Sequence, residues 1–329
     1  MNLATFDWNV LTMHKKWLCW ILFWAVIPSI KAQQLPQFTF YQDYHAVLNP
    51  AVIHHEYFLY DQNAKAGLAY RQQWTRLKGA PSTALMHGHW ITRNDGNAHL
   101  ITGGYLMQDR LGSTRQTSLY GQLGTVFSRD PYYGGISGAL SIGMNYLGID
   151  MDDIRANDIT EIPLDDLQSQ WYPDIGIGVF AQKQLNNDDN IYGGLSIPQF
   201  FSFQGYLNVG NREYRGVRRV PHYYATMGYI KYTSETSYIE PSVWVRYVET
   251  SGLHVDGMIR AQLSEEFWLG VGFSTEKTFH FQAGLSLGEN INSLNNYRFG
   301  YAFNQSFSEL SSVLGMTHEL FMSVAFSTR

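Results

Sequence analysis

The feature that most constrains this chain is a two-residue alternation of large apolar side chains with small or polar ones, repeated as far as the C-terminus. Near the end of the chain, for example, Phe279, Phe281 and Leu285 alternate with His280 and Gln282. Successive side chains of an extended strand point to opposite faces, so each such segment has one apolar and one polar face. The alternation predicts strands and gives no sign of an amphipathic helix of useful length.

The pattern predicts fourteen long strands. They lie near residues 65–76, 82–93, 97–107, 115–129, 134–149, 173–185, 189–197, 221–232, 238–249, 253–263, 265–275, 278–288, 293–304 and 316–327. The strands of a β-sandwich, the alternative all-β fold, usually have about 5–6 residues. Strands about twice that length favour a transmembrane antiparallel β-barrel, which leaves no free sheet edge in lipid.

The composition agrees with a barrel. Charged residues make up 16% of the chain, against roughly 25% in soluble domains, yet the mean hydropathy is only −0.23. An apolar lipid-facing half and a polar lumen-facing half of each strand would cancel in that average. The 22 Tyr and 9 Trp suit the two membrane interfaces.

The first residues predict a secretory signal peptide. Lys15 and Lys16 precede the apolar run from Trp17 to Ile30, and Ala32 offers a small residue for cleavage. That run is too short for a membrane-spanning helix, which needs about 20 apolar residues. We therefore expect residues 1–32 to be removed, together with the single cysteine, Cys19. Residues 33–64 should form a non-strand segment that plugs or underlies the barrel, and residues 65–329 the barrel itself.

Two long connections carry opposite charge. If the mature N-terminus is periplasmic, residues 150–172 and 198–220 both lie at the cell surface, as expected for the longer connections of such barrels. The candidate partner-binding residues in them are Asp152, Asp153, Asp165, Asp166, Arg212, Arg215, Arg218 and Arg219. The alternatives are two solvated loops, or loops that pair with each other or present a charged docking surface. The sequence leaves open whether the acidic connection binds a cation.

No catalytic, cofactor or metal site is predicted. Gly284–Gly288 matches the G-x-S-x-G pattern, but a nucleophile elbow needs a strand-to-helix turn, and these residues lie in an alternating strand. His87 and His89 share a strand face and His54 and His55 precede a Glu, but neither pair has a third ligand placed by sequence. The net charge of −5 argues against a nucleic-acid binder that relies on a basic face.

Several motifs together resemble the PorP/SprF family of outer-membrane proteins of type IX secretion. The segment Gln33–Phe38 followed by Asn49-Pro50-Ala51 is similar to the family's N-terminal motif, and Leu68–Trp74 followed by Gly79–Thr83 to its Y-R-x-Q-W…G-A-P-x-T signature. Pro173-Asp174 with Gly176 and Gly178 resembles a P-D-x-G-x-G element, and Gly315–Glu319 a terminal G-S-H-E element. The chain departs from the family at Val52–His55, where a Gly is usual, and at Thr317, which replaces Ser.

The resemblance implies an outer-membrane barrel of a Gram-negative bacterium. Such a barrel helps to export secreted proteins or to hold them, or gliding adhesins, at the surface. Its implied partners are those proteins and other type IX components, and the alternative is a porin or a carrier of hydrophobic solutes. The motif residues are Asn49, Pro50, Arg71, Trp74, Gly79, Pro81, Asp174, His318 and Glu319. Because a charge on the lipid face costs a few kcal/mol, Arg71 is expected to face the lumen and to pair with Glu319 or another carboxylate.

Overall fold

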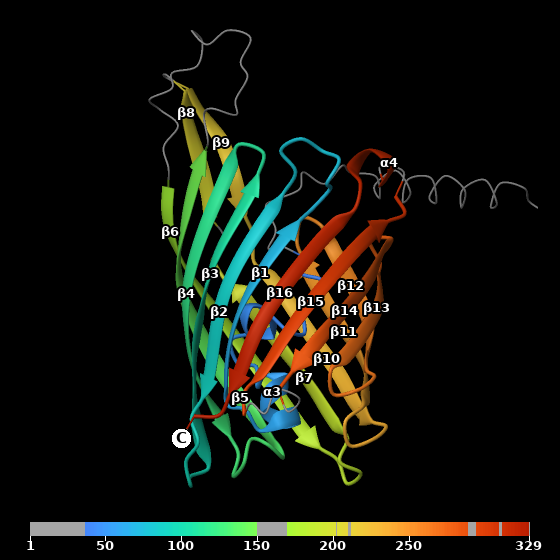
Figure 1. Ribbon diagram of the computed structural model, residues 1–329. Coiled ribbons are helices and arrows are strands. Elements are labelled where there is room, and N and C mark those ends of the chain that lie inside the picture. The colour runs from blue at the N-terminus through green and yellow to red at the C-terminus, as the bar shows by residue number, and fades with distance from the viewer. Residues whose placement is uncertain are drawn as a thin grey trace, which may run out of the picture.

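The computed structural model describes residues 37–149, 170–201, 203–209, 212–288, 294–308 and 311–328. Fourteen of its strands form one closed barrel (Figure 1). They are β1 (Ala64–Gln72), β2 (Ser82–Ile91), β3 (Ala98–Leu111), β4 (Thr114–Phe127), β5 (Gly134–Ile149), β6 (Gln170–Gln184), β7 (Asn190–Gln199), β10 (His222–Tyr232), β11 (Tyr238–Val248), β12 (Gly252–Gln262), β13 (Phe267–Ser274), β14 (Thr278–Leu287), β15 (Asn296–Ser306) and β16 (Thr317–Phe326). The closed antiparallel barrel and its strand number confirm the prediction.

The barrel closes between its first and last strands. β1 pairs antiparallel with β16, and Arg71 and Glu319 are directly opposed in the register. We call the end where β1 begins and β16 finishes the lower end, and the opposite one the upper end, as in Figure 1. The connections at 73–81, 249–251, 275–277 and 307–316 lie at the upper end.

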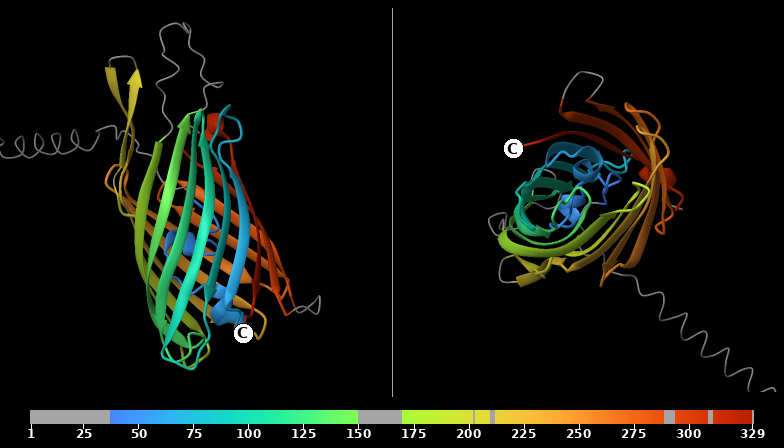
Figure 2. Two further views of the ribbon diagram at one scale, coloured as in Figure 1. Left: turned by 90° about the vertical axis from the view of Figure 1, so that its left-hand side faces the viewer. Right: turned by 90° about the horizontal axis from the view of Figure 1, so that it is seen from below.

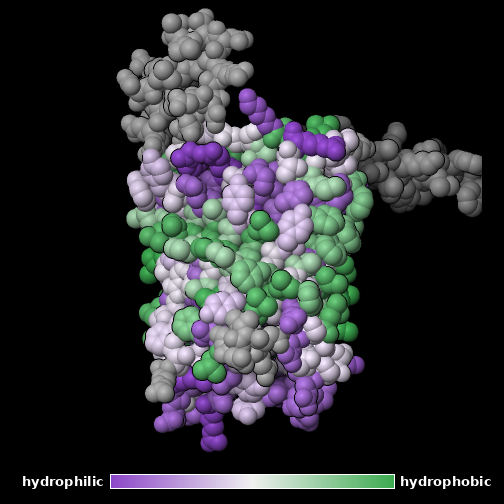
Figure 3. All heavy atoms as spheres, in the orientation of Figure 1, coloured by the Kyte–Doolittle hydropathy of each residue, from purple (hydrophilic) through white to green (hydrophobic). Residues whose placement is uncertain are grey.

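The strand alternation separates the two faces of the wall. On the paired strands β4 and β5, Gln122 faces Ser141 in the interior and both are buried, whereas the neighbouring Leu123 and Leu140 are exposed on the outside. On the face in view, Figure 3 shows hydrophobic residues gathered between two hydrophilic ends. The low charge content therefore reflects a wall with an apolar outside and a polar inside.

Two features of the strands differ from the sequence prediction. The stretch 198–220, expected to be a loop, contains the hairpin of β8 (Phe203–Val209) and β9 (Arg212–Arg219), which stands outside the barrel ring while β7 pairs directly with β10. β1 ends at Gln72 and not at residue 76, because Trp74 turns the chain with a φ of 47°.

The helices are short: α2 (His45–Leu48), α3 (His55–Tyr60) and α4 (Ser311–Leu314). Within the described ranges, none of them has the length and apolar character that a membrane-crossing helix requires. α2 and α3 belong to the segment 37–63, which precedes β1 and lies inside the ring of strands when the barrel is viewed from below (Figure 2).

Candidate functional site

The interior of the barrel is occupied by residues 37–63, which we call the plug. Its first described residue, Gln37, donates from Nε2 to Oε1 of Glu276 at the upper end (3.1 Å). Its last residue, Asn63, donates from Nδ2 to the carbonyl of Ile91 at the lower end (2.8 Å). The plug thus runs the length of the lumen, entering at the upper end and leaving where β1 begins.

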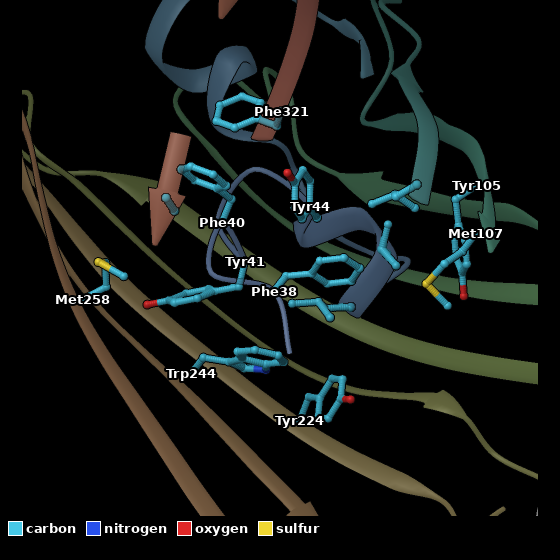
Figure 4. Close-up of a cluster of buried hydrophobic side chains, with 14 of the residues drawn as sticks. Phe38, Phe40, Tyr41, Tyr44, Tyr105, Met107, Tyr224, Trp244, Met258 and Phe321 are labelled. Carbon is cyan, nitrogen blue, oxygen red and sulfur yellow. The ribbon is translucent and has the colours of Figure 1, made fainter. Parts of the chain in front are cut away.

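Aromatic residues of the plug pack against the inner wall. In the cluster shown in Figure 4, Phe40 meets Phe321 of β16 with ring centroids 4.6 Å apart, and Tyr41 lies beside Trp244 of β11 at 5.4 Å. Phe40 is fully buried and Tyr41 is nearly so. The interior therefore has a packed core in its own right, and is more than a polar channel.

At the upper part of the lumen, Glu319 joins the plug to the seam of the barrel. Its carboxylate accepts hydrogen bonds from Arg71 Nη1 (2.7 Å) and from the backbone N–H groups of Thr39 (2.9 Å) and Phe40 (3.4 Å). Arg71 Nη1 also donates to Thr39 Oγ1 (2.9 Å). Arg71 thus points into the lumen, as the alternation predicted, and its pair is buried on both sides.

Below this seam contact, Asp43 of the plug lies between two arginines of the wall. Its carboxylate oxygens are 2.7 Å from Arg260 Nη2 and 3.2 Å from Arg298 Nη1. Both guanidinium groups lie over the ring of Trp268, at 4.8 and 5.3 Å from its centroid. Burial raises the pKa of Asp43, but the two arginines outweigh that effect and hold it at about 2. Asp43 is therefore ionised at neutral pH.

Nearer the lower end, further buried charges are paired. Glu56 of the plug accepts from Lys65 Nζ (2.7 Å), and His55 Nε2 lies 2.8 Å from Oε1 of Glu240 on β11. The same oxygen of Glu240 accepts from Tyr192 OH (2.6 Å). Within the described lumen, these contacts pair Lys65, Arg71, Arg260 and Arg298 with the carboxylates of Asp43, Glu56 and Glu319, and His55 with that of Glu240.

The N-P-A motif of the plug meets the P-D-x-G-x-G motif of the wall on β6. Asn49 Nδ2 donates to the carbonyl of Val179 on β6 (3.0 Å), and Asn49 Oδ1 accepts the N–H of Ala51 (3.0 Å). A Cβ atom at Gly178 would overlap Asn49 Oδ1, and one at Gly194 would lie 2.7 Å from Asn49 Nδ2. Glycine at these positions lets the plug backbone approach the wall, a contact that the sequence analysis did not find.

The remaining motif residues organise the upper end. Gly79, with a φ of 73°, accepts the N–H of Gly112 (3.0 Å), and Pro81 accepts that of Gln73 (2.9 Å). Trp74 supplies the turn that ends β1. Asp174 accepts from Tyr120 OH (2.9 Å) and from the N–H of Phe201 (3.3 Å).

His318, the next motif residue, lies outside the lumen. Its Nδ1 is 2.7 Å from the hydroxyl of Tyr301, and that contact is exposed. Among the motif residues, Asn49 and Pro50 belong to the plug, and Pro50 lies beside Gly178 of the wall. Arg71 and Glu319 belong to the wall and contact the plug. It does not gather all nine motif residues in one place.

The candidate partner loops are only partly covered by the structure. Asp152, Asp153, Asp165 and Asp166 lie outside the described residues. Arg212, Arg215, Arg218 and Arg219 lie on β9, opposite Val209, Tyr206, Gln204 and Phe203 of β8. The pairing of the acidic with the basic connection therefore stays a prediction.

The histidines singled out by sequence lie inside the barrel, His54 and His55 in the plug and His87 and His89 on the wall strand β2. His54, His87 and His89 are buried, and the rings of His54 and His89 meet edge to face with centroids 5.3 Å apart. Among the described residues, no group of three or more His, Cys, Asp or Glu side chains is arranged to hold a metal ion. Ser286 lies in β14, so the G-x-S-x-G match falls in a strand, as expected.

Comparison with known proteins gives a family and a fold. The model of the family described as "Type IX secretion system membrane protein PorP/SprF" matches residues 30–324. A search of curated proteins finds no match. Solved structures with a similar fold include a TodX mutant described as a monoaromatic hydrocarbon channel (TM-score 0.57, 10% identity, 86% of this chain and 94% of that chain) and the toluene transporter TbuX of Ralstonia pickettii (0.55, 11%, 86% and 93%).

Proposed function

The chain belongs to the PorP/SprF family of type IX secretion membrane proteins, and on that premise we propose that it acts in the outer membrane of a Gram-negative bacterium. There it supports the export of type IX substrates, or their retention at the cell surface, including adhesins. Its partners in this proposal are the secreted proteins and other components of the secretion system. The barrel performs no chemical step.

The observation that supports this proposal is the plug. Residues 37–63 contact the wall at β16, β12, β11, β7 and β6, through Glu319, Arg260, Ser242, Ser196 and Val179 respectively. A polypeptide could not pass through the lumen without breaking the buried ion pairs of Asp43 and the hydrogen bonds from Thr39 and Phe40 to Glu319. The partner would therefore bind at the upper end, where the hairpin β8–β9 leaves the barrel and where β5 ends and β6 begins.

The proposal is tested by deleting the gene and comparing the secreted and surface-attached proteins with those of the wild type. We expect a subset of them to be lost from the surface or retained in the periplasm, and to be restored by the wild-type gene. When a gene that lacks residues 203–219 is introduced into the deletion strain, its barrel should assemble in the membrane, but surface attachment should not be restored. Unchanged secretion and attachment, together with lost uptake of a solute, would overturn the proposal.

A hydrophobic-solute channel is the second candidate, because the fold is similar to that of monoaromatic hydrocarbon channels. Uptake of toluene by cells with and without the gene distinguishes the two candidates. A deletion that lowers uptake but leaves the surface proteins unchanged supports the channel. Lost surface proteins with unchanged uptake support the secretion role.

A further inference from the structure

A groove of about 770 Å³ crosses the outer face of the barrel near its lower end. It follows one row of the sheet, in which Phe127, Ile136, Ala181, Gly193 and Met227 are register partners on five successive strands, β4, β5, β6, β7 and β10. Phe127, Ile136 and Met227 are more than half exposed. The small residues Ala181 and Gly193 thus form the floor of a hollow between large apolar side chains.

The groove ends at two basic residues. Lys183 lies two residues beyond Ala181 toward the lower end, and Arg129 lies in the connection that follows β4; both line the groove and are exposed. Asp130, the one acidic residue in the lining, accepts the backbone N–H of Tyr132 (2.9 Å) and so bonds within its own connection. The groove therefore has an apolar body and a net positive mouth.

We propose that this groove binds one glycerophospholipid from the membrane leaflet at the lower end. An acyl chain lies over Ala181 and Gly193, between Ile136 and Met227, and the phosphate lies between Arg129 and Lys183. Apolar contact favours the chain, and the two cations favour an anionic headgroup at the membrane interface. The site is independent of the secretion role and requires only that the barrel sits in a bilayer.

Native mass spectrometry of the full-length mature barrel in detergent, titrated with palmitoyl-oleoyl phosphatidylglycerol, tests the site. We expect the wild type to retain one lipid at collision energies that remove all others. Ala181→Phe fills the floor and should weaken that retention about tenfold, the effect of roughly two methylene groups losing contact. Ala66→Phe adds the same side chain at an exposed outward position of β1, away from the groove, and should change nothing.

Charge variants keep the test decisive if Ala181→Phe fails to assemble. Arg129→Gln with Lys183→Gln should lower retention of phosphatidylglycerol, whereas Arg76→Gln with Lys78→Gln at the exposed upper connection should not. Equal retention in all variants would reduce the groove to ordinary lipid contact and overturn the proposal. Competition by oleate at a concentration equal to that of phosphatidylglycerol would also overturn the proposal, because a free fatty acid would then be the ligand.

Discussion

The buried pair of Arg71 and Glu319 joins the first and last strands and holds the start of the plug, so breaking it should be costly. Arg71→Leu leaves the Glu319 carboxylate buried without its cation, a change worth about 3–5 kcal/mol. We expect the barrel to unfold at a lower temperature, measured as the shift from folded to unfolded mobility in gel electrophoresis. Arg93→Leu is the matched control, because the Arg93–Asp61 pair is exposed and such pairs contribute about 0–1 kcal/mol.

The contact between Gly178 and Asn49 gives a second test at a single residue. Gly178→Ala places a methyl group on Asn49 Oδ1, and overpacking of this kind costs about 1–3 kcal/mol. We expect faster protease cleavage of the plug and a lower melting temperature, both partly restored by adding Asn49→Ala. Gly138→Ala is the control, since a Cβ there meets nothing within 4 Å. If Gly178→Ala and Gly138→Ala had equal effects, the contact between Gly178 and Asn49 would not hold the plug.

Single residues also show what the sequence could reveal. Arg71 was placed in the lumen because an arginine facing lipid is expensive, and that argument needs only the strand period. Asp43 was missed because its partners, Arg260 and Arg298, are 217 and 255 positions away. No local pattern links residues so far apart, and the closure of the barrel alone brings them together.

Among the elements, the plug makes a prediction about conductance. Asp43→Asn keeps the shape of the side chain but leaves Arg260 and Arg298 without their shared carboxylate. We expect openings in planar bilayers to become at least about tenfold more frequent than in the wild type. Asp61→Asn, whose partner Arg93 is exposed, should behave as the wild type does. A large, steady conductance in the wild type would contradict an anchored plug.

The same anchor predicts how the plug responds to pH. The pKa of Asp43 is about 2 in the folded protein, below its ordinary 3.8. The stabilisation is therefore complete above about pH 5 and is lost as the pH falls through the folded value. Wild-type conductance should stay low and constant from about pH 8 to pH 5 and rise only in more acid solution. A rise near pH 6 would contradict the assignment to Asp43, whose carboxylate stays ionised at that pH.

Elements were predictable in proportion to how regular their alternation is. The wall strands were found because lipid on one side and a polar lumen on the other impose a strict period of two. The hairpin β8–β9 stands outside the ring, where neither environment acts. Its second strand, with four arginines in eight residues, does not alternate and was taken for a loop. The plug was expected as a non-strand segment, but its path through the lumen depends on contacts with distant strands.

For the whole molecule, we propose that the upper end faces the cell surface, which places both ends of the wall, Ala64 and Phe326, on the periplasmic side. The path of the chain is unusual, because the first described residue of the plug, Gln37, lies at the upper end. The chain therefore passes down the lumen before the first strand begins. Its contacts reach β16, β12, β11, β7 and β6, so displacing the plug breaks bonds to strands around the ring.

Cysteine labelling tests that orientation, and it is clean because the single cysteine, Cys19, lies in the expected signal peptide. Lys78→Cys places a thiol on the exposed upper connection, and Asp95→Cys places one on the exposed lower turn between β2 and β3. In intact cells, a membrane-impermeant maleimide should label Lys78→Cys and leave Asp95→Cys unmodified, whereas permeabilised cells should label both. The reverse labelling pattern in intact cells would mean that the upper end faces the periplasm. The hairpin β8–β9 would then face the periplasm, and the secretion partner would have to be sought there.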